Sequence, residues 1–245
     1  MCGRTTSYTP PERLAEIFDA DLAPDLDRLP DGPHWNVGPT NNLFGLASPR
    51  KSESDDVQPV LDAYRWGLIP SWSKDKSQGN RLFNARAETL TTKPAFRKAF
   101  RARRLAVIVD GFYEWRKDSN GKRQPFYFHR GDGFPLAFAG LWEPWKDPQT
   151  DTWLHSCTII TTTAGPDLDG IHNRMPVIVE RHHLDPWLHA DGARESELTA
   201  FLQPAPVDTL IRYPVSSRIG NVRNDSPDLV QPVGSETHTQ QTLLA

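Results

Sequence analysis

Between residues 103 and 180 the chain is a succession of apolar, β-branched and aromatic segments separated by turn residues. These segments are RRLAVIVDGFYEWRK, QPFYFHR, FPLAFAGLW, HSCTIITTTA and RMPVIVE. The pair Asn120-Gly121, which follows the first of them, is a strong signal for the tight turn of a β-hairpin. Strand-like segments at such short spacing predict a curved, largely antiparallel sheet.

Helical patterns are found before and after this region. Leu14, Ile17 and Phe18 share one face of PPERLAEIFDA, and KPAFRKAFRARR repeats its apolar residues at helical spacing. HHLDPWLHA and ESELTAFLQ predict two short late helices. No segment repeats, and no linker is long enough to divide the chain. We therefore expect an α+β fold: a single domain over residues 1–232, with a barrel-like β-sheet core and peripheral helices, and a disordered tail over residues 233–245.

Composition sets limits on the class of protein. The 245 residues are 37% hydrophobic, which supports a large core, and the formal net charge is -3. That charge gives no global attraction to nucleic acid, although a local basic patch is enough to bind phosphates. No membrane-length apolar run and no apolar leader are found, so we expect a cytoplasmic protein without a membrane partner. There, Cys2 and Cys157 are not expected to form a disulfide. The histidines show no metal-ligand spacing, so no metal and no cofactor are expected.

Cys2 directly follows the first methionine. If Met1 is removed, one residue carries a free α-amine and a thiol on adjacent carbons. An α-amine has a pKa of about 8, so a useful fraction is unprotonated at neutral pH and can attack an aldehyde to form an imine. The thiol can then add to the imine carbon and close a five-membered thiazolidine. The alternative is that Cys2 is only a small buried hydrophobic residue.

Three polar residues could supply the amide and the proton-transfer groups that this chemistry needs. Asn84 in FNARAET offers an amide that both donates and accepts hydrogen bonds. Glu114 in DGFYEW ends an apolar strand between two aromatic residues, and His172 in GIHNRMP is suited to proton transfer near neutral pH. Each also has a purely structural interpretation: a turn cap, a solvent-facing strand residue and a loop histidine.

Eight motifs follow one another along the chain: MCGR, WNVGPTN, RWGLIPSW, FNARAET, DGFYEW, AGLWEPW, IHNRMPVIV and YPVSSRIGNVRND. In this order they resemble the SOS-response-associated peptidase (SRAP) family, abasic-site processing proteins that crosslink to DNA. The resemblance runs from Cys2 to about Pro232. One departure is Asn173, because the family pattern has an aspartate between the histidine and the arginine.

The resemblance implies that processed Cys2 forms a thiazolidine with the open-chain aldehyde of an abasic site in single-stranded DNA. It also implies roles for the three candidate partners. Asn84 would hold the amine and the sugar, Glu114 would be the acid–base carboxylate, and His172 would shuttle protons. The partner is then single-stranded DNA containing abasic sites, and the protein would be nucleoid-associated when bound to it.

The residues that hold DNA are expected near these motifs. Residues 81–130 contain thirteen lysines and arginines against four acidic residues, part of which is expected to be a solvated helix face and a charged hairpin. Arginine matches two phosphate oxygens at once, and Trp72 in IPSWSKD could stack on a base or pack in the core. No base-reading module is found. The expected DNA contacts are Gly3, Arg4, Pro39, Trp72, Arg86, Arg174 and Met175.

Three other functions stay open on sequence grounds. An N-terminal-nucleophile amidohydrolase, in which the thiol attacks an amide and the amine acts as base, can also begin with Met-Cys-Gly. A peptidase would act at least on the chain's own terminus by removing Met1, and a lyase side activity would cleave the DNA strand. A non-catalytic single-strand binder would not depend on Cys2. The chain is expected to act as a monomer.

Overall fold

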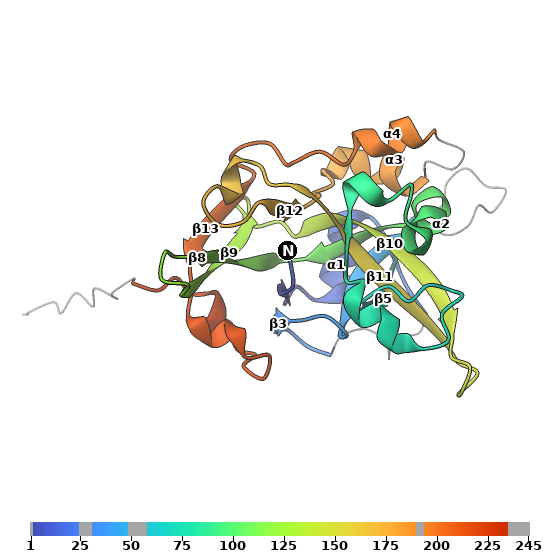
Figure 1. The fold of residues 1–245 in the computed structure, drawn as a ribbon, viewed down its shortest axis with the longest axis horizontal. Coiled ribbons are helices and arrows are strands. Elements are labelled where there is room, and N and C mark those ends of the chain that lie inside the picture. Colours follow the sequence, from blue (N-terminus) through green and yellow to red (C-terminus); the bar gives the residue numbers. More distant parts are fainter. Residues whose placement is uncertain (1, 25–30, 49–57, 190–193, 235–245) are drawn as a thin grey trace, which may run out of the picture.

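The computed structural model describes residues 2–24, 31–48, 58–189 and 194–234. Figure 1 shows a core of strands with short helices at its periphery. The strands form two sheets. Each sheet contains strands from the first part of the chain and strands from the region after residue 103. The tail predicted to be disordered, residues 233–245, lies almost wholly outside the described residues.

Five strands of the larger sheet close into a barrel: β4 (Asn42–Ala47), β5 (Val60–Trp66), β7 (Arg104–Val109), β10 (Leu136–Lys146) and β11 (Trp153–Thr163). Around the barrel the order is β5, β4, β7, β10 and β11, after which β11 pairs with β5 again. The closing contact is parallel and places Cys157 opposite Trp66, whereas the other pairs are antiparallel. Closure gives each of these strands a neighbour on both edges.

Strand β7 is buried along its whole length because both of its faces are covered. Leu105, Val107 and Val109 pack in a cluster that also contains Cys2. The alternate residues Ala106 and Ile108 pack in a second cluster with the helices. This two-sided burial explains the continuous apolar run LAVIV, which lacks the polar alternation of a half-exposed strand.

In the described residues, four α-helices are found where the periodicity predicts them: α1 (Pro11–Phe18), α2 (Pro94–Ala102), α3 (Leu184–His189) and α4 (Glu195–Ala200). Both α1 and α2 carry proline in the first turn, where its missing N–H costs nothing. The face of α2 that carries Phe96, Ala99 and Phe100 is buried against the barrel. Figure 1 shows α2, α3 and α4 gathered at one end of the molecule.

The second sheet has the order β13 (Leu210–Pro214), β9 (Arg123–Arg130), β8 (Gly111–Lys117), β1 (Thr5–Ser7) and β3 (His34–Val37). Only Asp110 separates β7 from β8, so the chain passes directly from the barrel into this sheet. Strands β8 and β9 form the predicted hairpin, and Gly121 in its turn has φ +82°, a conformation that favours glycine. The expected α+β fold with a barrel-like core is therefore confirmed.

Shorter elements complete the larger sheet and the connections. Strands β2 (Asp21–Leu22), β6 (Asn84–Arg86) and β12 (Arg174–Pro176) extend the barrel. The segment RMPVIVE is a strand only over its first three residues, since Ile178 makes just an isolated bridge to Phe138. The 3₁₀ helices in the part of the chain that the structure describes are η2 (Lys76–Arg81), η3 (Ala87–Thr89), η4 (Pro166–Leu168), η5 (Arg181–His183), η6 (Ser217–Gly220) and η7 (Pro227–Val230).

Two general findings concern the described part of the chain. None of its helices has the length and apolar character needed to cross a membrane. Cys2 and Cys157 are both buried and free.

Candidate functional site

The site is organised around Cys2, which precedes β1 and is fully buried. Strand β1 pairs antiparallel with β8, with Thr5 opposite Phe112, and continuing this register brings Gly3 opposite Glu114. The backbone supports the extension, because the N–H of Tyr113 donates to the carbonyl oxygen of Arg4 at 3.0 Å. Glu114 is only 3% exposed. The pairing thus sets a buried carboxylate beside the segment that carries the thiol.

Asn84 reaches Cys2 from the barrel. Strand β6 lies parallel to β11, with Asn84 opposite Ile159. The preceding carbonyl oxygen, that of Phe83, accepts hydrogen bonds from Trp66 Nε1 at 2.8 Å and from the Ile159 N–H at 3.1 Å. From this fixed position Asn84 Nδ2 donates to the carbonyl oxygen of Cys2 at 2.6 Å. Its amide oxygen is buried and accepts no hydrogen bond from the described residues.

The surroundings of Cys2 favour the neutral thiol. Burial raises the pKa of the Cys2 thiol strongly, and the carboxylate of Glu114 raises it further. A hydrogen bond from the backbone N–H of Arg4 acts in the opposite direction but is a smaller effect. The thiol is therefore protonated at neutral pH, unlike the thiolate of an enzyme whose cysteine attacks first.

His172 lies in the turn between η4 and β12 and is half-buried. The backbone N–H of Arg174 donates to its Nδ1 at 2.9 Å. The same ring nitrogen lies 3.1 Å from the carbonyl oxygen of Arg174, so the backbone of Arg174 fixes the orientation of the imidazole. Strand β12 is paired to β11, with Arg174 opposite Thr163, and β6 is paired to the same strand. Asn84 and His172 are therefore both positioned by β11.

Three of the expected DNA contacts, Trp72, Arg86 and Pro39, have exposed or half-buried positions. Trp72 is 63% exposed in the turn before η2, so the alternative of core packing is excluded for it. Arg86 is exposed at the end of β6. Pro39 is half-buried next to Gly38, where a Cβ would come within 2.7 Å of Arg4 Nη1, so the guanidinium of Arg4 packs directly on this backbone.

Gly3 and Arg4 are half-buried, and the guanidinium of Arg4 has a hydrogen-bond partner within the protein. Arg4 Nη1 donates to the carbonyl oxygen of Gly3 at 2.9 Å. Burial lowers the pKa of Arg4 somewhat, because a cation loses hydration when it is covered.

Arg174 and Met175 have surroundings that the sequence did not predict. Arg174 holds the carboxylate of Glu88 with both terminal nitrogens, at 2.5 and 3.0 Å, and donates to the carbonyl oxygen of Thr161. These bonds hold the pKa of Glu88 below its usual range. Met175 is 1% exposed, and its sulfur accepts a hydrogen bond from the Gly165 N–H at 3.1 Å. In this structure Met175 is covered and packs in the Cys2 cluster, so the expected contact of its side chain with a base stays a prediction.

Glu88 is the residue of this region that sequence reasoning missed. It lies in the motif FNARAET, two residues after Arg86, and its exposed carboxylate neutralises Arg174. One signal in the sequence could have pointed to Glu88. It is the acidic residue of the motif FNARAET, whose other charged residue is Arg86.

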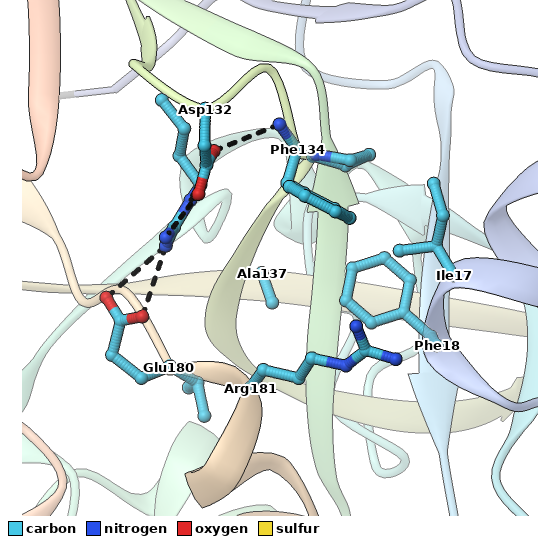
Figure 2. A pocket seen from close by; sticks show the side chains of 10 residues that line it. Ile17, Phe18, Asp132, Phe134, Ala137, Glu180 and Arg181 are labelled. Atoms are coloured by element: carbon cyan, nitrogen blue, oxygen red, sulfur yellow. Dashed lines mark hydrogen bonds and ion pairs between the residues drawn. The ribbon is translucent and has the colours of Figure 1, made fainter.

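A separate pocket of 190 Å³ lies between α1, the β9–β10 connection and residues 179–181, and Figure 2 shows its lining. Its walls combine apolar side chains with four charged ones, and Arg130 forms ion pairs with Asp132 and Glu180 on one side. No candidate catalytic residue lines it. In the described residues no group of three or more potential ligands could hold a metal ion. Cys2 and its neighbours are therefore the candidate site.

The fold and the site define a class of protein: a closed β-barrel with a second sheet, in which a cysteine at the start of the first strand is held against a buried carboxylate. The chain belongs to the SOS response associated peptidase (SRAP) family, whose profile matches residues 1–222. The family expected from the motifs is thereby confirmed, while the predicted domain end at residue 232 stays a prediction.

Named relatives agree with this assignment. "Abasic site processing protein YoqW" of Bacillus subtilis is 36% identical over 234 residues, which is 94% of this chain and 99% of the relative. "Abasic site processing protein HMCES" of Gallus gallus is 30% identical over 264 residues, covering 95% of this chain and 78% of the relative.

Solved structures have the same fold. A Bacteroides thetaiotaomicron protein superimposes with a TM-score of 0.82 at 22% identity, over 94% of this chain and 99% of its own. A Bordetella bronchiseptica protein gives a TM-score of 0.72 at 26% identity, over 88% of this chain and 100% of its own.

Proposed function

We propose that this protein processes abasic sites in single-stranded DNA by capturing them covalently through Cys2. Family membership and the names of the relatives support abasic-site processing. The observation that carries the chemical proposal is the hydrogen bond from Asn84 to the carbonyl oxygen of Cys2, beside the buried Glu114. Such a clamp on the first residues of a chain has a clear use if the terminal amine takes part in a reaction.

The reaction begins with hydrolysis of the Met1–Cys2 peptide bond, which frees the amine of Cys2. That amine adds to the aldehyde carbon of the ring-opened sugar, and the resulting carbinolamine loses one water to form an imine. The thiol sulfur then adds to the imine carbon while the thiol proton ends on nitrogen. The product is a thiazolidine, and the balance of the capture is one water released.

The protonated state of the thiol supports this order of events. A thiol whose pKa is raised by burial and by a neighbouring carboxylate is a poor first nucleophile. A terminal amine is partly unprotonated at neutral pH and attacks aldehydes readily. Nitrogen therefore attacks first, and sulfur closes the ring.

Each neighbour has a role in this scheme. Asn84 fixes the backbone of Cys2, and its free amide oxygen accepts a hydrogen bond from the amine or the sugar. Glu114 takes the proton from the thiol and returns it to nitrogen. His172, whose ring is oriented by the backbone of Arg174, assists the opening of the sugar and the departure of water.

The single strand is held without reading its sequence. Trp72 offers an exposed ring on which a base can stack, and Arg86 offers an exposed cation for a phosphate. An abasic nucleotide is already unpaired, so placing its sugar in the site costs less than extruding an intact nucleotide.

The experiment that tests the proposal separates the amine from the thiol. Wild type, Cys2→Ala and Cys2→Ser are incubated with a single-stranded oligonucleotide that contains one abasic site, with and without borohydride, and run on a denaturing gel. Wild type should give a heat-resistant band without reductant. The variants keep the terminal amine and form only an imine or a labile ring, so their band should need borohydride.

Two results would contradict the proposal. A Cys2→Ala band equal to wild type without reductant would remove the thiol from the chemistry. No band from wild type would leave a non-covalent binder, provided that the same preparation still binds intact single strands.

A further inference from the structure

Two of the arginines nearest Cys2 already have partners within the protein, so they do not fully neutralise the phosphates of a bound DNA strand. Arg174 is bound to Glu88 by two hydrogen bonds, and Arg4 is partly engaged with the carbonyl oxygen of Gly3. A strand that crosses the site carries a phosphate on each side of the lesion, and its affinity depends on cations that can meet these phosphates. A phosphate beside the lesion therefore requires a further cation on the elements that border Cys2.

The β8–β9 hairpin presents one of its two faces toward Cys2. Side chains alternate along β8, so Phe112, Glu114 and Arg116 share one face. On β9, Phe126 lies opposite Glu114, and cross-strand partners point to the same side of a sheet. Phe112 and Phe126 pack in the cluster that contains Cys2, which fixes this face as the Cys2 side.

Arg116 is held on that face by an aromatic ring. Its guanidinium carbon lies 4.9 Å from the centre of the Phe126 ring, a cation–π contact that limits where the charge can be. The side chain is exposed, and no carboxylate among the described residues pairs with it. Because Arg116 is two residues beyond Glu114, it is displaced by ~7 Å along the strand.

We propose that the Cys2 side of the β8–β9 hairpin binds the sugar–phosphate backbone of the single strand on one side of the lesion, with Arg116 as its phosphate contact. Stacking on Phe126 leaves the N–H groups at the edge of the guanidinium free to meet two phosphate oxygens. In Figure 1 the hairpin extends away from the start of the chain, so a DNA strand that leaves the site could lie along it. This inference rests on the proposed function, because it takes abasic single-stranded DNA as the ligand.

The neighbouring residue is a matched control. Lys117 is exposed and carries the same charge, but it lies on the opposite face of β8, with Tyr113 and Trp115. Replacing either cation by alanine changes the net charge equally. A difference between the two variants therefore reports position and not overall charge.

The test compares wild type, Arg116→Ala and Lys117→Ala in binding to an intact single-stranded oligonucleotide over a series of salt concentrations. Arg116→Ala should bind about fivefold more weakly at low salt, as expected for one exposed charge contact. The slope of log affinity against log salt should become shallower by about 0.7, the value for one phosphate contact on a single strand. Lys117→Ala should match wild type in both quantities.

A second measurement locates the contact. Oligonucleotides with one abasic site carry a single uncharged methylphosphonate linkage at successive positions on either side of it, and the rate of adduct formation is measured at subsaturating protein. Wild type should slow at one linkage close to the lesion, and Arg116→Ala should be insensitive to that linkage.

The outcomes separate this inference from the proposed function. If wild type forms the adduct but Arg116→Ala behaves like Lys117→Ala at every salt concentration and every linkage, the surface is wrong and the function stands. If wild type forms no adduct, yet its binding to the intact strand and the salt slope depend on Arg116 and not on Lys117, the surface stands and the covalent function is wrong. Absence of both binding and adduct overturns both.

Discussion

At the scale of single residues, the site concentrates groups that are costly to bury. Glu114 is 3% exposed and Cys2 is fully buried, although a carboxylate in such a place loses most of its hydration. Folded proteins retain such groups where chemistry needs them, so their co-location is a stronger pointer to function than either residue alone. The sequence predicted both residues, but only the pairing of β1 with β8 shows that they are neighbours.

We expect Glu114→Gln to slow adduct formation about a hundredfold, because it removes a group that moves protons while keeping its size. The rate is measured with the abasic oligonucleotide in excess over protein. Affinity for an intact single strand should be unchanged, since the amide occupies the same volume. Loss of that affinity together with the rate would assign Glu114 a structural role.

Two residues show where sequence reasoning at this scale stops. Arg174 was expected to face phosphates, yet Glu88, 86 positions earlier in the chain, neutralises it. Met175 was expected to pack against a base or the sugar, and in this structure its side chain is covered. Whether a side chain is free depends on partners that are distant in sequence, and no local pattern contains that information.

At the scale of elements, Asp110 joins the barrel, the second sheet and the start of α1. It lies between β7 and β8, and its carboxylate accepts hydrogen bonds from the backbone N–H groups of Tyr8 and Thr9 and from the Thr9 hydroxyl. Burial raises its pKa in spite of these donors. The folded chain therefore favours the protonated carboxyl, and this contribution to stability is present below the ordinary carboxyl pKa and lost as pH rises through the raised one.

We expect Asp110→Ala to lower the free energy of unfolding by about 1–3 kcal/mol, because buried donors lose their acceptor. Asp110→Asn keeps an acceptor without a charge, so it should stay within about 1 kcal/mol of wild type at neutral pH. Urea denaturation between mildly acidic and neutral pH measures both. The loss of stability with rising pH that Asp110 causes should be absent from Asp110→Asn. An Asn variant as unstable as the Ala variant would contradict this account.

The elements themselves were largely predictable. Their signals are local, because each depends only on residues that are adjacent in the sequence. Examples are the proline at the start of α1 and α2, the Asn120-Gly121 turn and the apolar run of β7. The short β12 was not, because RMPVIVE has strand composition over its whole length, whereas its ladder with a partner strand, β11, ends at Pro176 and only the single bridge from Ile178 to Phe138 follows. Strand formation needs that partner, whereas a helix satisfies its own backbone.

At the scale of the whole molecule, closure of the barrel creates the site. The contact between β11 and β5 and the bond from Trp66 to the Phe83 carbonyl fix β6, and β6 carries Asn84 to Cys2. The sequence predicted a barrel-like sheet, but the order of its strands and the place of closure arise from long-range pairing. Asn84 and Cys2 are 82 positions apart, so their contact is a product of the fold.

The central claim is that one residue, Cys2, supplies both the nitrogen and the sulfur that capture the lesion. Intact mass spectrometry of the purified protein, before and after incubation with an abasic oligonucleotide, tests it most directly. The account predicts a chain that lacks the mass of Met1, and an adduct equal to protein plus oligonucleotide minus one water, with the modified peptide containing Cys2. An adduct formed by a chain that still carries Met1, or one attached at another residue, would contradict it.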